Sequence, residues 1–260
     1  MIILVCFVSI LILFVLAAFL NAQYLTTKRP VESLLNERKN SPDYCRFENI
    51  SEDVKKYFIL IEDPCFYQHN GVNLGNTIRR GISCLFQRDQ VNRGSTISPQ
   101  IAKNLYLPFQ KTAFRKMTEL IICLKIERSL TKEEIFNFYL NVIYFGNNMY
   151  GITDASEYYF YKKPAELTAN QAIIFACLIA APNAAEPVHY PEKFYSLKKR
   201  KLEKCFQEGL ISREDLNYFC SFPENCPDPE FVPAIQKTNE IPFIILENER
   251  FGPFCKSDIR

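Results

Sequence analysis

The sequence predicts a mainly α-helical protein preceded by one membrane-spanning helix. Three observations support this prediction. Positions 2–20 contain neither charge nor proline, capping sequences at Thr131 and Thr168 precede apolar residues at helical spacing, and the two-residue alternation typical of strands is scarce. A helical domain behind a hydrophobic anchor is therefore the expected architecture.

Composition narrows the classes of function. The chain has 260 residues, of which 48% are hydrophobic, and a formal net charge of +2. It can bury a core, and its charge gives no global reason to expect nucleic acid as a partner. The ten cysteines form no CxxC pair and the two histidines offer no zinc-type spacing. We expect no protein-bound metal, and the disulfide state stays open.

The anchor is assigned to residues 1–22. At 1.5 Å per residue, positions 2–20 span about 28 Å, close to the ~30 Å of a bilayer core. A cleaved signal peptide is the alternative, with Asn21 after the cleavage point, but its apolar region is usually shorter than this run. Lys28 and Arg29 follow the run, and the positive-inside rule then weakly favours an inward-facing domain.

The rest of the chain divides by composition into three parts. Residues 113–130 and 169–181 have helical patterns, and a basic helix is expected from Lys193 to Lys204 before the sequence turns proline-rich. The three parts are a juxtamembrane linker with some local structure, the principal domain, and a helical and irregular extension packed on it, over residues 23–50, 51–190 and 191–260.

The first candidate site is Glu62, in the stretch FILIEDP. Its carboxylate follows an apolar run and Pro64 forces the helix to stop there. A carboxylate with apolar neighbours suits general acid–base chemistry. The alternative is a solvated turn, which is common for acids at helix ends.

The second candidate is the stretch NRGSTISPQIAKNLYL, residues 92–107. Ser98 is expected to cap a helix, with Pro99 at its first position. A helix that begins there would direct free amides at an anion, and Lys103 adds a charge one turn later. A plain junction between a loop and a helix is the alternative.

The third candidate is the stretch AFRKMTE. On a helix, Arg115 and Lys116 lie four and three residues before Glu119, so the three side chains share a face. Two cations beside one carboxylate would hold it ionised and still offer donors to a phosphate. A weak surface ion pair is the alternative.

Together, EDPCFYQHNG, GSTISPQIAKN, RKMTE and YLNVIYFG, in this order over residues 55–190, resemble glycosyltransferase family 51 and in particular its monofunctional peptidoglycan glycosyltransferases, the biosynthetic transglycosylases. The resemblance implies a lysozyme-like helical large lobe and a small membrane-proximal lobe. It also implies that the chain polymerises lipid II into β-1,4 glycan strands with inversion and releases undecaprenyl diphosphate.

The resemblance also assigns roles to residues. It implies that Glu62 is the general base and Glu119 the second essential acid. The fourth motif is implied to be largely structural, through Tyr139, Asn141, Phe145 and Gly146. The implied substrate-binding residues are Asp63, Phe66, His69, Arg79, Ser95, Thr96, Gln100, Lys103, Asn104, Arg115 and Lys116.

Some positions depart from the family pattern. Arg93 and Pro99 replace a usual Gly and Gln, and Asn73 and Asn137 stand where acids are frequent or usual. These departures put substrate affinity in doubt more than the reaction. Arg93 and Pro99 keep one alternative open, an inactive membrane-tethered scaffold, and the carboxylate pair keeps a second, a glycan-cleaving lytic enzyme. The cations among the motifs argue against both.

The resemblance finally implies partners and a location. The expected partners are lipid II, the growing strand and the membrane, with cell-wall transpeptidases and division or elongation proteins as further candidates. No cofactor is required, although Mg or Mn is a candidate at the diphosphate. The expected location is the bacterial inner membrane, single-pass, with the catalytic domain on the extracytoplasmic face. Apolar and basic residues between Leu105 and Phe114 are expected to dip into the interface or, equally, to fold back onto the domain.

Overall fold

The computed structural model describes residues 1–71, 96–108, 112–184 and 190–221. The predictions for Asn73, Arg79, Arg93 and Ser95 therefore lie outside the described residues. The described chain is helical and contains no β-strand, apart from an isolated bridge between Tyr144 and Tyr150. The mainly α prediction is confirmed. The α-helices are α1 (Ile2–Lys28), α2 (Val31–Lys39), α3 (Glu52–Glu62), α5 (Ile97–Tyr106), α6 (Ala113–Ser129), α7 (Lys132–Val142), α8 (Ile152–Phe160), α9 (Ala169–Leu178), α10 (Pro191–Gln207) and α11 (Arg213–Cys220).

The described residues form two compact units, and each is assembled from separate parts of the chain. Unit 1 contains residues 1–39 and 67–136, and unit 2 contains residues 40–66 and 137–221. Helices α1, α2, α5 and α6 belong to unit 1, while α3 and α8 to α11 belong to unit 2. Helix α7 begins in unit 1 and ends in unit 2.

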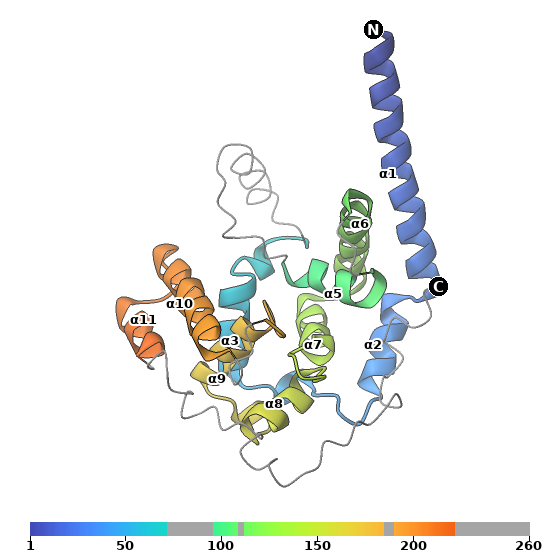
Figure 1. Ribbon diagram of the computed structural model, residues 1–260. Helices are drawn as coiled ribbons and strands as arrows, with labels where there is room; N and C mark the ends of the chain where they lie inside the picture. The colour runs from blue at the N-terminus through green and yellow to red at the C-terminus, as the bar shows by residue number, and fades with distance from the viewer. Residues whose placement is uncertain (72–95, 109–111, 185–189, 222–260) are drawn as a thin grey trace. The chain divides into compact units, whose positions relative to one another are not determined.

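Helix α1 is long and apolar enough to cross a membrane. It continues for eight residues beyond the apolar run to Lys28, and this last part packs against α6 (Figure 1). Ala18 and Ala22 are fully buried, and their small side chains allow the two helices to approach closely. Lys125 of α6 donates to Thr26 at 2.7 Å. The segment expected to be a linker thus contributes the end of α1 and all of α2 to unit 1.

The stretch between Leu105 and Phe114 is divided between core and surface. Leu105, Tyr106 and Leu107 are buried, and the Tyr106 hydroxyl donates to the Arg29 carbonyl at 2.8 Å. The prediction of membrane contact was therefore wrong for these three residues, because their apolar side chains fill unit 1. Phe114 packs edge-to-face on Phe14, with 5.9 Å between ring centroids, and residues 109–111 lie outside the described chain.

Helix α5 begins two residues earlier than predicted. Thr96 is its N-cap residue, so Ser98 and Pro99 lie inside the first turn. Ser98 does not cap the helix because its hydroxyl instead donates to the carboxylate of Glu127 on α6. Pro99 is tolerated at this position because the first-turn amides have no intrahelical acceptor.

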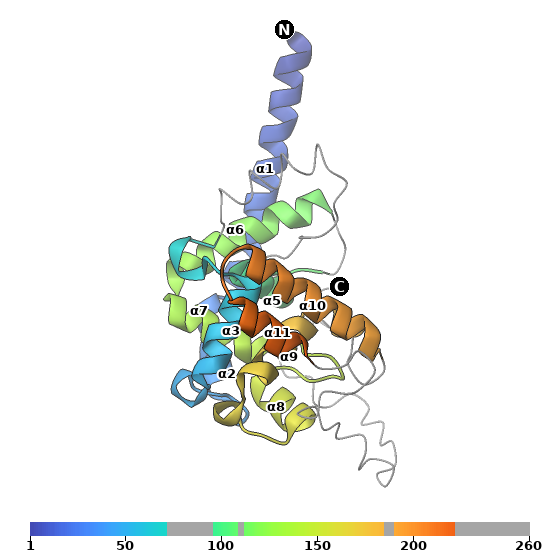
Figure 2. The ribbon, with the colours of Figure 1, turned by 90° about the vertical axis from the view of Figure 1, so that its left-hand side faces the viewer.

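Unit 2 is built on the contact between α3 and α9, with α10 packed on both (Figure 2). Phe145 links the two helices, since its ring centroid lies 6.3 Å from that of Phe58 and 4.8 Å from that of Phe175. Gly146 has φ +89°, and a Cβ there would lie 2.7 Å from the Pro182 carbonyl oxygen. These contacts agree with a structural role for the fourth motif.

Local sequence signals account for several helix boundaries. Both predicted capping boxes are present: Thr131 exchanges hydrogen bonds with Glu134, and Thr168 does so with Gln171. Helices α6 and α10 confirm the helical patterns predicted at 113–130 and 193–204.

Candidate active site

Glu119 lies in unit 1 between two cations from its own helix. Nη1 of Arg115 donates to Oε2 of Glu119 at 2.8 Å, and Nζ of Lys116 donates to Oε1. The predicted shared face is confirmed. The Glu119 side chain is 1% exposed while that of Lys116 is 59% exposed. A weak surface ion pair does not describe this arrangement, because the carboxylate is buried and its lysine partner still faces solvent.

The trio retains donors for an anion. Two cations face one carboxylate, so the group carries a net positive charge. Nε of Arg115 is buried and has no hydrogen-bond partner among the described residues. A buried donor without a partner is costly, and a phosphate oxygen would satisfy it.

Helix α5 packs against α6 and carries four predicted substrate-binding residues, Thr96, Gln100, Lys103 and Asn104. Gln100 is 9% exposed, and the other three are half-buried. The Thr96 hydroxyl donates to the Gly71 carbonyl at 2.8 Å. Unit 1 thus unites the described parts of the second and third motifs on one helix pair.

A polar cluster that the sequence motifs did not indicate lies beside these helices. Glu127 accepts from Ser98 and forms an ion pair with Lys132 at 2.7 Å, and its side chain is 4% exposed. Gly71 has φ +81°, and an added Cβ would lie 2.6 Å from the sulfur of Cys123. A side chain at position 71 is excluded both by this contact and by the left-handed backbone.

Glu62 is the last residue of α3 in unit 2, and its side chain is 8% exposed. Nζ of Lys201 on α10 lies 2.5 Å from Oε1 of Glu62 and 2.9 Å from the carbonyl oxygen of Ala176 on α9. The partner of Glu62 was not predicted. The sequence offered one signal. Lys201 follows Phe194 by seven residues and precedes Cys205 by four, a spacing that places it on the same face of α10 as these two buried residues.

The neighbours of Glu62 differ in charge. Burial, with the Glu62 and Asp63 carboxylates nearby, raises the pKa of Tyr139 well above its ordinary value. Burial also raises the pKa of Cys177 to about 11. Burial lowers the pKa of Lys201, while the Glu62 carboxylate and the nearby Cys177 and Cys205 raise it, and the net shift is upward. Near neutral pH the phenol and thiol are uncharged and the lysine is a cation.

The remaining residues of the first motif occupy different environments. Asp63 caps the C-terminus of α3 and is 3% exposed. Phe66 is fully buried in unit 2, and its role in substrate binding stays a prediction. His69 is half-buried and belongs to unit 1.

The order of these motifs and the helical fold agree with a comparison across protein families. The family model described as Transglycosylase matches residues 27–206. This chain belongs to the transglycosylase family. The matched range includes both carboxylates, Glu62 and Glu119, and also Lys201.

Individual transglycosylase relatives support the assignment. A monofunctional glycosyltransferase of Staphylococcus haemolyticus is 33% identical over 210 residues, which are 78% of this chain and 77% of that protein. Penicillin-binding protein 1F of Bacillus subtilis is 35% identical over 166 residues, 64% of this chain and 23% of that protein. Penicillin-binding protein 1A of Escherichia coli is 33% identical over 170 residues, which are 65% of this chain and 20% of that protein. The chain spans most of the first relative and less than a quarter of the other two.

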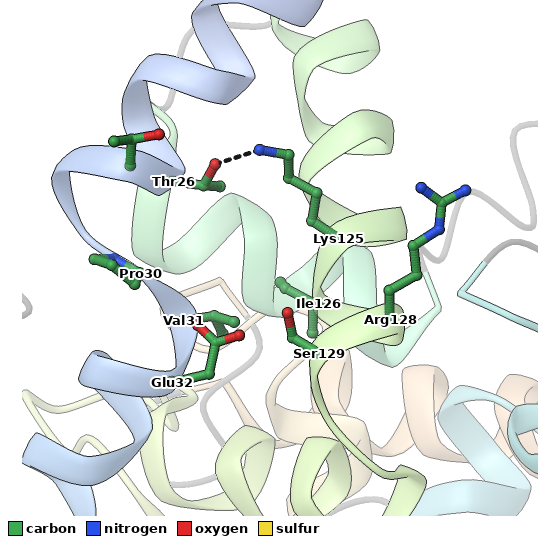
Figure 3. Close-up of a pocket in the computed structure, with 9 residues that line it drawn as sticks. Thr26, Pro30, Val31, Glu32, Lys125, Ile126, Arg128 and Ser129 are labelled. Atoms are coloured by element: carbon green, nitrogen blue, oxygen red, sulfur yellow. Dashed lines mark hydrogen bonds between the residues drawn. The ribbon is translucent and has the colours of Figure 1, made fainter.

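A cavity of about 290 Å³ lies elsewhere in unit 1 of this transglycosylase, between the α1–α2 junction and α6 (Figure 3). Lys125 and Ile126 line one side, and Pro30 and Val31 line the other. The Lys125 ammonium donates to the Thr26 hydroxyl at 2.7 Å. The cavity contains neither candidate carboxylate. Within the described ranges, no three His, Cys, Asp or Glu side chains are arranged to hold a metal ion.

Proposed function

We propose that this chain is a peptidoglycan glycosyltransferase that polymerises lipid II, with Glu62 as its general base. The observation that carries the proposal is a largely buried carboxylate at the end of α3, in a chain of the transglycosylase family. Lipid II and the growing glycan strand are the substrates that this family implies.

The proposed step is an inverting displacement. Glu62 accepts the proton of the acceptor sugar's 4-hydroxyl as that oxygen attacks the anomeric carbon of the donor. The bond from this carbon to the diphosphate breaks, and its electron pair leaves with the diphosphate oxygen. Attack from the opposite face converts an α-linked donor into a β-1,4 glycan and releases undecaprenyl diphosphate.

The cations of unit 1 have the complementary role in this proposal. Arg115 and Lys116 bind the diphosphate as negative charge accumulates on the leaving oxygen, with Lys103 on α5 as a further candidate. The buried Nε donor of Arg115 supports this assignment. The mechanism requires no cofactor. Mg²⁺ or Mn²⁺ bound by the diphosphate itself would need no protein cage, and EDTA treatment followed by metal addition tests its contribution.

The proposed location is the inner membrane, with the catalytic domain on the extracytoplasmic face. Helix α1 supports single-pass anchoring by its length and apolarity, and lipid II presents its sugars outside the cytoplasm. Protease added to the outer face, after outer-membrane permeabilisation where needed, should digest residues 30–260. Complete protection would contradict this orientation. Transpeptidases that crosslink the glycan product, and division or elongation proteins, are proposed protein partners.

The decisive experiment incubates the detergent-solubilised full chain with labelled lipid II. The parent should form glycan polymer, and Glu62→Gln should lower the rate at least about a hundredfold because the proton acceptor is lost. Glu52→Gln is the matched control, since Glu52 lies on the same helix and its side chain is 88% exposed. A parent that cleaves preformed glycan would instead support a lytic enzyme, and a parent without turnover would support a scaffold. A Glu62→Gln variant at the parental rate would refute the base assignment.

A further inference from the structure

Lys201 lies on the buried face of an otherwise basic, solvent-facing helix. Phe194, Leu202 and Cys205 of α10 are buried against unit 2, while Lys199 and Arg200 are exposed. The Lys201 side chain is 19% exposed. A lysine on such a face needs compensation for its lost hydration, and it obtains this from two oxygens, one on α3 and one on α9.

The two contacts of Lys201 restrict the geometry of its ammonium. The carbonyl oxygen of Ala176 is fixed by helix α9, so it holds Nζ at a defined position 2.9 Å away. From that position Nζ contacts Oε1 of Glu62 at 2.5 Å. The direction of the Glu62 carboxylate is thus set by two neighbouring helices as well as by its own.

Charge around Glu62 also depends on Lys201. The titratable groups near Glu62 on packed elements are Tyr139 on α7, Cys177 on α9 and Lys201 on α10, with Asp63 next to it in the chain. Lys198 of α10 is also buried and acts on Cys177, and its ammonium donates to Asn170 at 2.7 Å. Tyr139 and Cys177 are neutral near pH 7, and Asp63 carries the same charge as Glu62. Lys201 is the cation of this group that the structure places in direct contact with the Glu62 carboxylate.

We propose that Lys201 is a positioning residue for Glu62, which fixes the direction of the carboxylate and places a positive charge beside it. This inference rests on the proposed function, because it assumes that Glu62 is the base. The ammonium does not contact the reacting atoms in this proposal. It acts through the carboxylate, and its removal should alter both the rate and its dependence on pH.

The test measures kcat and KM for lipid II from about pH 5 to pH 9. Lys201→Met removes the charge and keeps most of the side-chain length. We expect kcat to fall about tenfold or more at neutral pH, with KM changed by less than about twofold. The acidic limb of the kcat profile should move to higher pH and part of the rate should return at alkaline pH, because the ammonium no longer lies beside the carboxylate.

Two further variants separate this role from a structural one. Lys201→Arg keeps the charge and should preserve the acidic limb, with kcat within about threefold of the parent. Lys204→Met is the matched control on the same helix, because Lys204 pairs at 3.6 Å with Glu208, and it should leave kcat and the limb unchanged. Circular dichroism and thermal unfolding report the fold of each variant. If Lys201→Met does not fold, Lys201→Gln should show the same displacement of the acidic limb.

The outcomes distinguish this inference from the function on which it rests. If Glu62→Gln is inactive while a folded Lys201→Met keeps the parental rate and acidic limb, the positioning role is refuted and the base assignment stands. A uniform loss at every pH that Lys201→Arg does not restore would also refute the positioning role. If Glu62→Gln is fully active, the base assignment fails whatever the lysine variants show.

Discussion

Glu119 in unit 1 and Glu62 in unit 2 are both buried carboxylates paired with lysine, but they obtain their partners differently. Glu119 binds Arg115 and Lys116 within one turn of its own helix. Glu62 binds Lys201, which is 139 residues away in the chain. The Glu119 trio therefore needs one helix to form, while the Glu62 pair needs α3, α9 and α10 to be packed together.

The difference corresponds to two kinds of chemistry. Two cations around one carboxylate leave an excess of positive charge, which suits the binding of a diphosphate. The pairing of one ammonium with Glu62 produces no such excess, which suits a group that must exchange a proton. Burial of an acid therefore does not define its function, because the number and origin of its countercharges decide its use.

The largest expected effect tests the dependence of the Glu62 pair on packing. Leu202 is fully buried beside Lys201 on α10, so Leu202→Ala should lower the free energy of unfolding by about 2–5 kcal/mol. Urea unfolding of the solubilised chain measures this. Leu210→Ala, at a position 36% exposed, should cost less than about 1 kcal/mol. Equal effects of the two substitutions would show that α10 is not part of the unit that carries Glu62.

The next effect tests the positive excess at Glu119. Lys116→Ala should weaken binding of undecaprenyl diphosphate about tenfold to a hundredfold, because a charge-assisted contact to the anion is lost. Binding of the neutral disaccharide portion should change less, and calorimetry with both ligands measures the contrast. Arg128→Ala, an exposed cation further along α6, is the control. Equal losses for both ligands would remove the phosphate role.

A smaller effect concerns α7, which begins in unit 1 and ends in unit 2. Thr131→Ala removes the capping box with Glu134 and should cost about 1 kcal/mol, which lowers Tm by about 2–4 °C. Thr131→Ser keeps the hydroxyl and should behave like the parent in thermal unfolding. If Thr131→Ser lowered Tm as much as Thr131→Ala does, the capping hydroxyl would not be the source of the stability.

The smallest effect appears at alkaline pH. The pKa of Lys201 is raised above its ordinary value of 10.5, so the stabilisation by its ion pair is present below that value and is lost as pH rises through the raised pKa. Above about pH 10.5 the stability of the parent should therefore fall more steeply than that of Lys201→Met. Identical slopes in urea unfolding would contradict a charged pair in the native state.

The sequence predicts those parts of the molecule that depend on neighbours within one turn. The Glu119 trio and both capping boxes follow from spacings of three and four residues, which fix side-chain proximity on any helix. The start of α5 was misplaced by two residues because the Ser98 hydroxyl serves Glu127, a partner that no local pattern reveals. The basic run of α10 likewise does not reveal that Lys198 and Lys201 face inward while Lys199 and Arg200 are exposed.

Apolarity also left one question that only packing answers. The stretch from Leu105 to Phe114 has the composition of a membrane-dipping loop, but its first three residues belong to the core of unit 1. Core and bilayer both remove apolar surface from water, so hydropathy does not distinguish them. Burial of Leu105, Tyr106 and Leu107 does.

The packing of α1 against α6 attaches the membrane anchor rigidly to unit 1. A flexible linker of about 28 residues would have a root-mean-square end-to-end distance of roughly 30 Å, so an attached domain could move over that distance. Helix α6 cannot move in this way relative to α1, because the two helices are held together by packing at Ala18 and Ala22 and by the Lys125–Thr26 hydrogen bond. With α1 inserted in a bilayer, the Glu119 trio stays at a constant height above the lipid tails. The trio and a lipid-borne diphosphate then meet by diffusion in two dimensions. Confinement to the same membrane raises the effective concentration of the diphosphate without any additional contact.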